Sequence, residues 1–247
     1  MSTTPPPILV LLPGMDGTGI MFEPFLRVLD GLEARVVRYP VALTSYPDCV
    51  AFARAQLPVD RRFLLLGESF SGPVAIALAA EQPAGLAGLV LCGTFARNPR
   101  PGLAWTAPLL RALPPSRLPL PLLRRLLLDR WDSGPLAVLV QAMLPQAPVA
   151  TLKARLLAVL AVDHTPLLSE IQVPILALVA SHDRLVPRSA TDWIRTHRSI
   201  DTVTLQGPHW LLQTRPEACV QAIADFQARN RKPQDALPGM SSAGDEA

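Results

Sequence analysis

Short apolar runs alternate with segments of helical periodicity through the first third of the chain, and no other feature constrains the fold as strongly. The runs at 8–12, 62–67 and 86–92 are almost entirely apolar, which is typical of strands buried on both faces. A further strand is expected at 34–39, and helices are expected at 17–30, 48–57 (with Asp48 as N-cap) and 69–81. Strands joined in this way form a parallel sheet with right-handed crossovers. The sequence therefore predicts an α/β fold, with a mostly parallel sheet and helices on both faces.

The alternation stops after Gly93 and resumes near residue 173. Between these points we expect only short helices broken by prolines, at 118–128, 135–144 and 149–161. Strands are then expected at 173–180 and 202–205, with helices at 189–196 and 216–229. We therefore predict a core made of residues 1–93 and 166–230, a helical lid inserted at 94–165, and a disordered polar tail at 231–247.

The composition excludes several classes of protein. With 49% hydrophobic residues, the 247-residue chain can bury a large core, which argues against wholesale disorder. A net charge of +3 is too small to indicate a nucleic-acid partner, and no apolar run is long enough to span a membrane. Cys49, Cys92 and Cys219 are far apart, so neither a disulfide framework nor a cysteine zinc site is expected. With no evident targeting segment, these features predict a cytoplasmic protein without a metal site.

The most informative motif is GESFSG at 67–72, which lies between an apolar strand and an Ala-rich helix. A strand, a tight turn and a helix hold a nucleophile in strained backbone geometry with its oxygen clear of the sheet. Small residues must surround such a turn, and Gly67, Ser71 and Gly72 meet this need around Ser69. Ser69 is therefore the predicted nucleophile, because Ser71 would lie half a turn into the helix. The structural alternative is that Ser69 only caps the helix.

A serine nucleophile needs a general base, and His209 has the placement for that role. It lies in GPHW after the last predicted strand, at the same sheet edge as Ser69. Asp183 follows the strand at 173–180 at that edge and is the predicted acid that orients His209. The order Ser69, Asp183, His209 is one of the known chain orders of a serine–histidine–acid triad. The remaining histidines are predicted to be surface or packing residues: His164, His182 and His197.

Acyl transfer places negative charge on the carbonyl oxygen, and two backbone N–H groups are expected to bind it. One is the N–H of Phe70, directly after the nucleophile. The other is expected in the glycine-rich loop 13–19, with the Met15 N–H as the candidate donor. The loop is not a phosphate-binding loop, because no Lys-Ser or Lys-Thr pair follows Gly19. Its glycine spacing also differs from that of a dinucleotide fingerprint.

Taken together, LLPGMDGTG, GESFSG, SHDRLVP and GPHWLLQTRPE resemble the motifs of small bacterial α/β-hydrolases. The nearest group is the single-domain esterases that include pimeloyl-ACP methyl ester carboxylesterase, and the resemblance covers roughly residues 8 to 230. It implies an α/β-hydrolase fold, a Ser69–His209–Asp183 triad, a lid inserted after the fourth strand, and no cofactor. Two positions depart from the pattern. Pro13 replaces a histidine that is common before the oxyanion glycine, and Ser71 replaces the second glycine of the turn.

The inserted segment 94–165 has a net charge of +6, against −3 for the rest of the chain. A lid with an apolar underside and a basic exterior would bind an acyl chain and attract an acidic carrier protein or an anionic surface. The alternative is a solvated surface on which arginine stems cover leucines. Trp105 and Trp210 are the predicted substrate-binding residues. The arginines considered for a carrier are Arg111, Arg117, Arg124, Arg125, Arg130 and Arg155.

These observations predict a serine esterase that cleaves small-molecule carboxylic esters through an acyl-enzyme intermediate. An acyltransferase would use the same triad with an alcohol or amine in place of water. A non-catalytic ligand-binding protein would keep the fold without the reaction. Peroxide-dependent halogenation uses similar triads, whereas dehalogenases are disfavoured because Ser69 stands where they need an aspartate.

Overall fold

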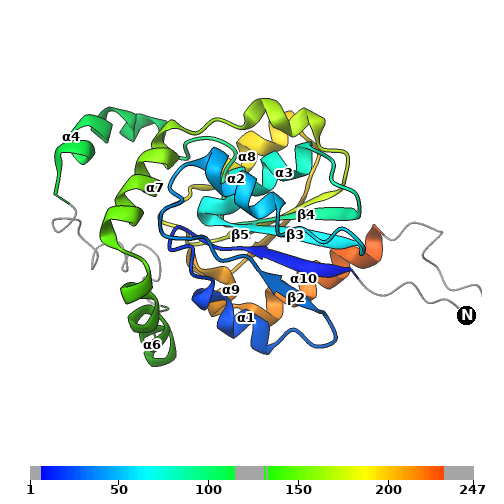
Figure 1. Ribbon diagram of the computed structural model, residues 1–247. Coiled ribbons are helices and arrows are strands. Elements are labelled where there is room, and N and C mark those ends of the chain that lie inside the picture. The colour runs from blue at the N-terminus through cyan, green and yellow to red at the C-terminus, as the bar shows by residue number, and fades with distance from the viewer. Residues whose placement is uncertain (1–6, 115–130, 132, 231–247) are drawn as a thin grey trace, which may run out of the picture.

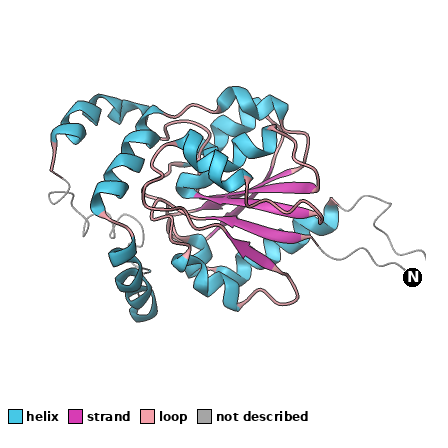
Figure 2. Ribbon diagram, viewed as in Figure 1, coloured by secondary structure: helices cyan, strands magenta, loops and turns pink. Residues whose placement is uncertain are grey.

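The computed structural model describes residues 7–114, 131 and 133–230. Its core is a six-stranded parallel sheet in the order β2-β1-β3-β4-β5-β6 (Figure 2). The strands are β1 (Ile8–Leu12), β2 (Ala34–Val36), β3 (Phe63–Glu68), β4 (Leu86–Cys92), β5 (Ile175–Ala180) and β6 (Asp201–Leu205). The predicted α/β fold with a parallel sheet is confirmed. The strand order reverses between β1 and β3, and open α/β sheets build their sites beside such a reversal, at the carboxyl ends of the strands.

Helices cover both faces of this sheet because its central strands are apolar on both sides. In β1, Ile8, Val10 and Leu12 belong to one core, while Leu9 and Leu11 belong to the other. The first core is covered by α2 (Tyr46–Arg54), α3 (Gly72–Ala80) and α8 (Arg188–His197). The second core is covered by α1 (Glu23–Arg27), α9 (Leu211–Thr214) and α10 (Pro216–Arg229), on the opposite face in Figure 1. Such double coverage is what continuous apolar strands require.

Between β4 and β5, the described residues form helices and no strand, and a single isolated bridge joins Arg97 to Asp163. The helices are η3 (Pro101–Thr106), α4 (Ala107–Ala112), α6 (Gly134–Met143), η6 (Leu144–Gln146), α7 (Val149–Ala161) and η7 (Thr165–Glu170). Figure 1 shows α4, α6 and α7 at one end of the sheet. The helix expected at 118–128 and the tail expected at 231–247 lie outside the described residues.

A small apolar cluster joins this insertion to the core. Val140, Met143 and Leu152 pack with Met21 and with the partly buried Trp210. In the described part of the chain, no single helix is long and apolar enough to cross a membrane. The α6–η6 segment and α7 reach that length and composition only together, across a bend of 94°.

Two local predictions were wrong for identifiable reasons. The helix expected at 17–30 is only η1 (Ile20–Phe22) followed by α1, because Gly17 and Gly19 adopt left-handed conformations with φ of 76° and 72°. The expected N-cap Asp48 is instead the third residue of α2. Ser45 caps this helix, and its hydroxyl oxygen accepts from the Asp48 N–H at 3.3 Å. The proline at the second position of α2 suits the first turn of a helix, which favours this earlier start.

Candidate active site

Ser69 lies at the turn between β3 and α3, in a backbone conformation that non-glycine residues rarely adopt. Its φ is 49°, and the segment Ser69–Ser71 forms a single 3₁₀ turn before α3 begins. The turn is tight: a Cβ on Gly67 would lie 2.7 Å from the carbonyl oxygen of Ser71. A Cβ on Gly72 would overlap the side chain of Thr94. The two glycines are therefore required by close packing, and the predicted nucleophile itself has a backbone conformation that costs energy.

The structure brings Ser69, His209 and Asp183 together in one hydrogen-bonded chain. The Ser69 Oγ lies 2.8 Å from His209 Nε2, and His209 Nδ1 lies 2.7 Å from Asp183 Oδ2. The other carboxylate oxygen, Asp183 Oδ1, accepts the N–H groups of Leu185 and Val186, each at 2.8 Å. Those two bonds fix the carboxylate, which in turn fixes the ring of His209 with Nε2 toward the serine.

His209 is almost completely buried, with 2% of its surface exposed. Burial by itself lowers the pKa of its imidazole, but the charge and hydrogen bond of Asp183 outweigh burial and raise that pKa above its ordinary value. A base with a raised pKa takes a proton from a hydroxyl more readily, and Asp183 stabilises the imidazolium that results.

The other histidines lie elsewhere. His164 Nδ1 is 2.8 Å from the carbonyl oxygen of Pro73, His182 pairs with the Ser181 hydroxyl, and His197 contacts Trp193. Within the described ranges, no three His, Cys, Asp or Glu side chains are grouped so that they could hold a metal ion.

The loop with the predicted oxyanion donor Met15 lies between β1 and η1, at the carboxyl edge of the sheet. Gly14 accepts the Gly17 N–H at 3.1 Å, and the Asp16 carboxylate accepts the Thr18 N–H at 2.9 Å. No hydrogen bond among the described residues uses the Met15 N–H. The loop is therefore internally braced while this donor stays free, as an oxyanion donor must be.

The two positions that depart from the hydrolase pattern contact each other. The Ser71 hydroxyl donates to the carbonyl oxygen of Pro13 and lies 3.0 Å from the Tyr39 hydroxyl. Ser71 is completely buried. Its bond to Pro13 connects the turn at Ser69 directly to the glycine-rich loop 13–19, which is called the oxyanion loop below. The sequence shows only a small residue at this position, and nothing in the spacing indicates its partner.

Phe70, whose N–H is the other predicted donor, anchors the turn from the inside. Its side chain is fully buried, and its ring stacks on Tyr46 with centroids 4.8 Å apart. This packing holds the residue that follows the nucleophile in place.

A buried carboxyl that the sequence analysis did not single out lies next to the nucleophile. Glu68 ends β3, is 4% exposed, and accepts a 2.9 Å hydrogen bond from Gln213 Nε2. Burial raises the pKa of Glu68 to about 7; the Gln213 bond opposes this and the Asp16 charge adds to it. An acid at the end of an otherwise apolar strand is the sequence signal that would have marked it.

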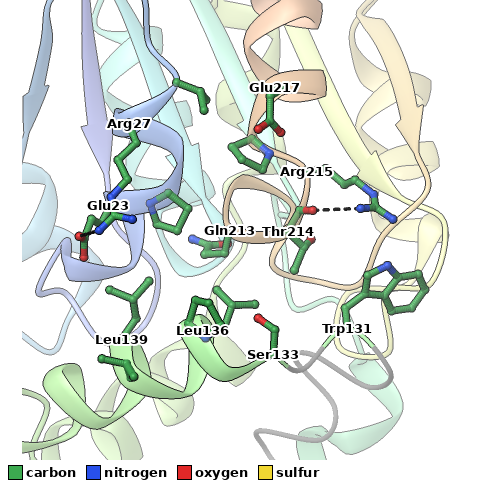
Figure 3. A pocket seen from close by; sticks show the side chains of 15 residues that line it. Glu23, Arg27, Trp131, Ser133, Leu136, Leu139, Gln213, Thr214, Arg215 and Glu217 are labelled. Carbon is green, nitrogen blue, oxygen red and sulfur yellow. Dashed lines mark hydrogen bonds and ion pairs between the residues drawn. The ribbon is translucent and has the colours of Figure 1, made fainter.

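The predicted substrate-binding tryptophans have different surroundings. Trp105 is 73% exposed on η3, whereas Trp210 packs in the cluster between the insertion and the core. A separate cavity of about 680 Å³ lies between α1, α6 and the start of α10 (Figure 3). Figure 3 shows Leu136 and Leu139 of α6 on one side and Gln213 on another. The triad does not line this cavity.

One of the six arginines predicted to form the basic exterior of the insertion is buried. Arg155 is completely buried, and it donates to the carbonyl oxygens of Met15, Pro40 and Leu43. It therefore does not belong to a basic exterior, and its inclusion there was wrong. Arg111 is described and lies in α4. Outside the described residues lie Arg117, Arg124, Arg125 and Arg130.

Comparison with known proteins gives one family match. The model of the alpha/beta hydrolase family Abhydrolase_6 matches residues 9–222. No curated protein is a significant match.

Solved structures with the same fold are numerous and distant in sequence. A lipase-esterase related protein from Clostridium acetobutylicum is similar with a TM-score of 0.78 and 15% identity, over 91% of this chain and 96% of that one. An enol-lactonase from Burkholderia xenovorans has a TM-score of 0.70 at 19% identity, over 90% of this chain and 91% of that one. An esterase from Exiguobacterium antarcticum has a TM-score of 0.72 at 15% identity, over 90% and 92%. At these identities the likeness concerns the fold.

Proposed function

The chain belongs to the alpha/beta hydrolase family, and on that premise we propose that it is a serine hydrolase of carboxylic esters that works through an acyl-enzyme intermediate. The observation that carries the proposal is the hydrogen-bonded chain from Ser69 Oγ through His209 to Asp183. The esterases and the enol-lactonase with the same fold support ester chemistry as the reaction class.

In the first half-reaction, Ser69 Oγ attacks the ester carbonyl carbon and transfers its proton to His209 Nε2. The new C–O bond turns the carbonyl oxygen into an oxyanion, which the Met15 and Phe70 N–H groups bind. His209 then gives its proton to the leaving alcohol oxygen as the ester C–O bond breaks. The acyl group remains on Ser69.

In the second half-reaction, water takes the place of the alcohol. His209 accepts a proton from water as its oxygen attacks the acyl carbon, and the same N–H groups bind the second oxyanion. The bond to Ser69 then breaks, the serine oxygen recovers the proton from His209, and the acid leaves. The Asp183 carboxylate keeps its hydrogen bond to His209 Nδ1 and stabilises the imidazolium in both steps.

A fluorophosphonate probe and a chain-length series of p-nitrophenyl esters test this proposal. We expect labelling on Ser69, loss of labelling in Ser69→Ala, and ester turnover by the wild type. Ser71→Ala is the control for the site of labelling, because it changes the neighbouring serine and leaves the nucleophile: it should still be labelled on Ser69, although more slowly. Labelling that persists in Ser69→Ala contradicts the assignment of Ser69. Labelling without turnover of any ester contradicts the esterase proposal.

Adding alcohol or amine acceptors to the same assay separates hydrolase from acyltransferase. The acyl-enzyme is common to both, and partitioning of product to the acceptor over water would make the protein a transferase. The narrower likeness to pimeloyl-ACP esterases stays a prediction.

An acidic carrier also stays a prediction from the charge of the insertion. If an acidic carrier binds the insertion, kcat/KM for a carrier-bound ester falls steeply as the salt concentration rises, while kcat/KM for a small neutral ester does not.

A further inference from the structure

The buried arginine of the insertion makes an unusual set of contacts. Arg155, in α7, has no exposed surface, and all three nitrogens of its guanidinium donate to backbone carbonyls. Nη1 lies 2.8 Å from the oxygen of Met15, Nε lies 2.9 Å from that of Leu43, and Nη2 lies 3.3 Å from that of Pro40. Two of these partners lie in the segment after β2, and the third lies in the oxyanion loop.

The oxyanion loop is shaped around this guanidinium. A Cβ on Gly17 would overlap Arg155 Nη1, so the glycine leaves the space that the arginine occupies. Burial lowers the pKa of Arg155, while the nearby Asp16 carboxylate opposes that shift. Removing a cation from water is costly, and a buried arginine is retained only where its hydrogen bonds are well made.

The bond to Met15 is one of the braces that reach the loop from outside it. Ser71 holds the Pro13 carbonyl, and the Gly17 N–H holds the Gly14 carbonyl. Arg155 holds the next carbonyl, that of Met15. With three successive carbonyls held, the Gly14–Met15 peptide has little freedom to turn, and its N–H keeps one direction.

Arg155 also lies near the second predicted donor. Its guanidinium carbon is 5.8 Å from the centre of the Phe70 ring and 5.8 Å from that of Tyr39. The same side chain thus packs beside the two residues whose N–H groups would bind the oxyanion.

We infer that Arg155 is a positioning residue of the oxyanion hole, through which the insertion holds the Met15 N–H in its catalytic direction. This inference rests on the proposed serine-hydrolase function. The insertion, which the sequence predicts to be a lid, then also contributes to catalysis, because a helix outside the sheet holds the loop after β1 in place.

The expected effect is on the transition state. Loss of an oxyanion-hole donor in a serine hydrolase costs roughly 10²–10³ in kcat. Loss of Arg155 misplaces a donor without deleting it, so we expect kcat to fall by roughly 10- to 100-fold, below that range. KM should change little, because the N–H binds the oxyanion more strongly than the ground-state carbonyl.

The test compares Arg155→Met and Arg155→Lys with Thr151→Val. Thr151 lies one turn earlier on α7, and its hydroxyl donates to the carbonyl oxygen of Val41 at 3.0 Å. Its hydrogen bond therefore docks the same helix onto the same segment and does not involve a carbonyl of the oxyanion loop. The measurements are the rate of Ser69 labelling by a fluorophosphonate, kcat and KM on a p-nitrophenyl ester, and circular dichroism as a check on folding.

We expect slow labelling and low kcat in Arg155→Met, intermediate values in Arg155→Lys, and near wild-type values in Thr151→Val. Added methylguanidine should restore part of the labelling rate in Arg155→Ala and leave the wild type unchanged. If Arg155→Met does not fold, Arg155→Lys still tests the inference, and labelling as fast as in Thr151→Val would overturn it.

Three outcomes are distinguishable. Wild-type labelling with equally fast labelling in folded Arg155→Met overturns the role of Arg155. If Thr151→Val and Arg155→Met lose equal amounts of labelling rate and kcat, Arg155 only docks the helix. This result also overturns the inference. A wild type that is neither labelled nor active contradicts the proposed function itself.

Discussion

Replacing Glu68 with Gln should remove a pH dependence of stability that this one buried carboxyl imposes. Burial raises the pKa of Glu68 from 4.5 to about 7. The folded state therefore binds a proton that the unfolded state has released, and folding becomes less favourable as pH rises between these two values. The contribution of protonated Glu68 to the unfolding free energy is fully present below pH 4.5 and is lost once the pH has passed about 7.

The magnitude follows from the same shift. One pKa unit corresponds to about 1.4 kcal/mol, so the wild type should lose about 3 kcal/mol of unfolding free energy across the whole window. Between about pH 5 and about pH 8 the expected loss is about 2–3 kcal/mol. Glu68→Gln cannot ionise and should lack this loss. Its side-chain oxygen can still accept the Gln213 hydrogen bond.

Urea denaturation of both proteins across this pH range measures the difference. All other titrating groups are shared, so they largely cancel when the two curves are subtracted. The same substitution at the exposed Glu170 is the matched control, because it removes a carboxyl without removing a buried one. Parallel curves for wild type and Glu68→Gln would refute the reasoning, since the Glu68 carboxylate would then carry no burial cost.

Three further changes test the site. Asp183→Asn should lower kcat roughly 10⁴-fold by favouring the wrong tautomer of His209. It should also move the acid limb of the kcat/KM profile to lower pH, because the Asp183 charge raises the pKa of His209; an unmoved limb would contradict this. Ser71→Ala should lower kcat by about tenfold with folding intact, because the Pro13 carbonyl loses its partner. Steady-state kinetics measures this, and an unchanged kcat would contradict it. Gly72→Ala should destabilise the fold by about 1–3 kcal/mol, because its Cβ would overlap Thr94, and thermal unfolding checks this.

Much of the fold follows from local pattern. The predicted bounds of β1, α7 and α10 agree with the structure, because a proline stands directly before β1 and α7 and at the first position of α10. The helix expected at 17–30 was wrong because two glycines with positive φ turned its first part into a loop. Periodicity reports the spacing of apolar residues, and it does not report the space at Gly17 and Gly19, where a Cβ would overlap Arg155 and Val36 respectively.

The sequence by itself determined the sheet, the turn at Ser69 and the order of Ser69, Asp183 and His209. These follow from alternation along the chain and from the rule that parallel strands share a carboxyl edge. Only the tertiary structure decided which contacts Arg155, Ser71 and Glu68 make. Arg155 reaches the Met15 carbonyl across 140 positions, and Ser71 reaches that of Pro13 across 58. From the sequence, an arginine in a basic segment is expected at the surface. Its burial and its hydrogen-bond partners are properties of the folded chain, so only the structure reveals them.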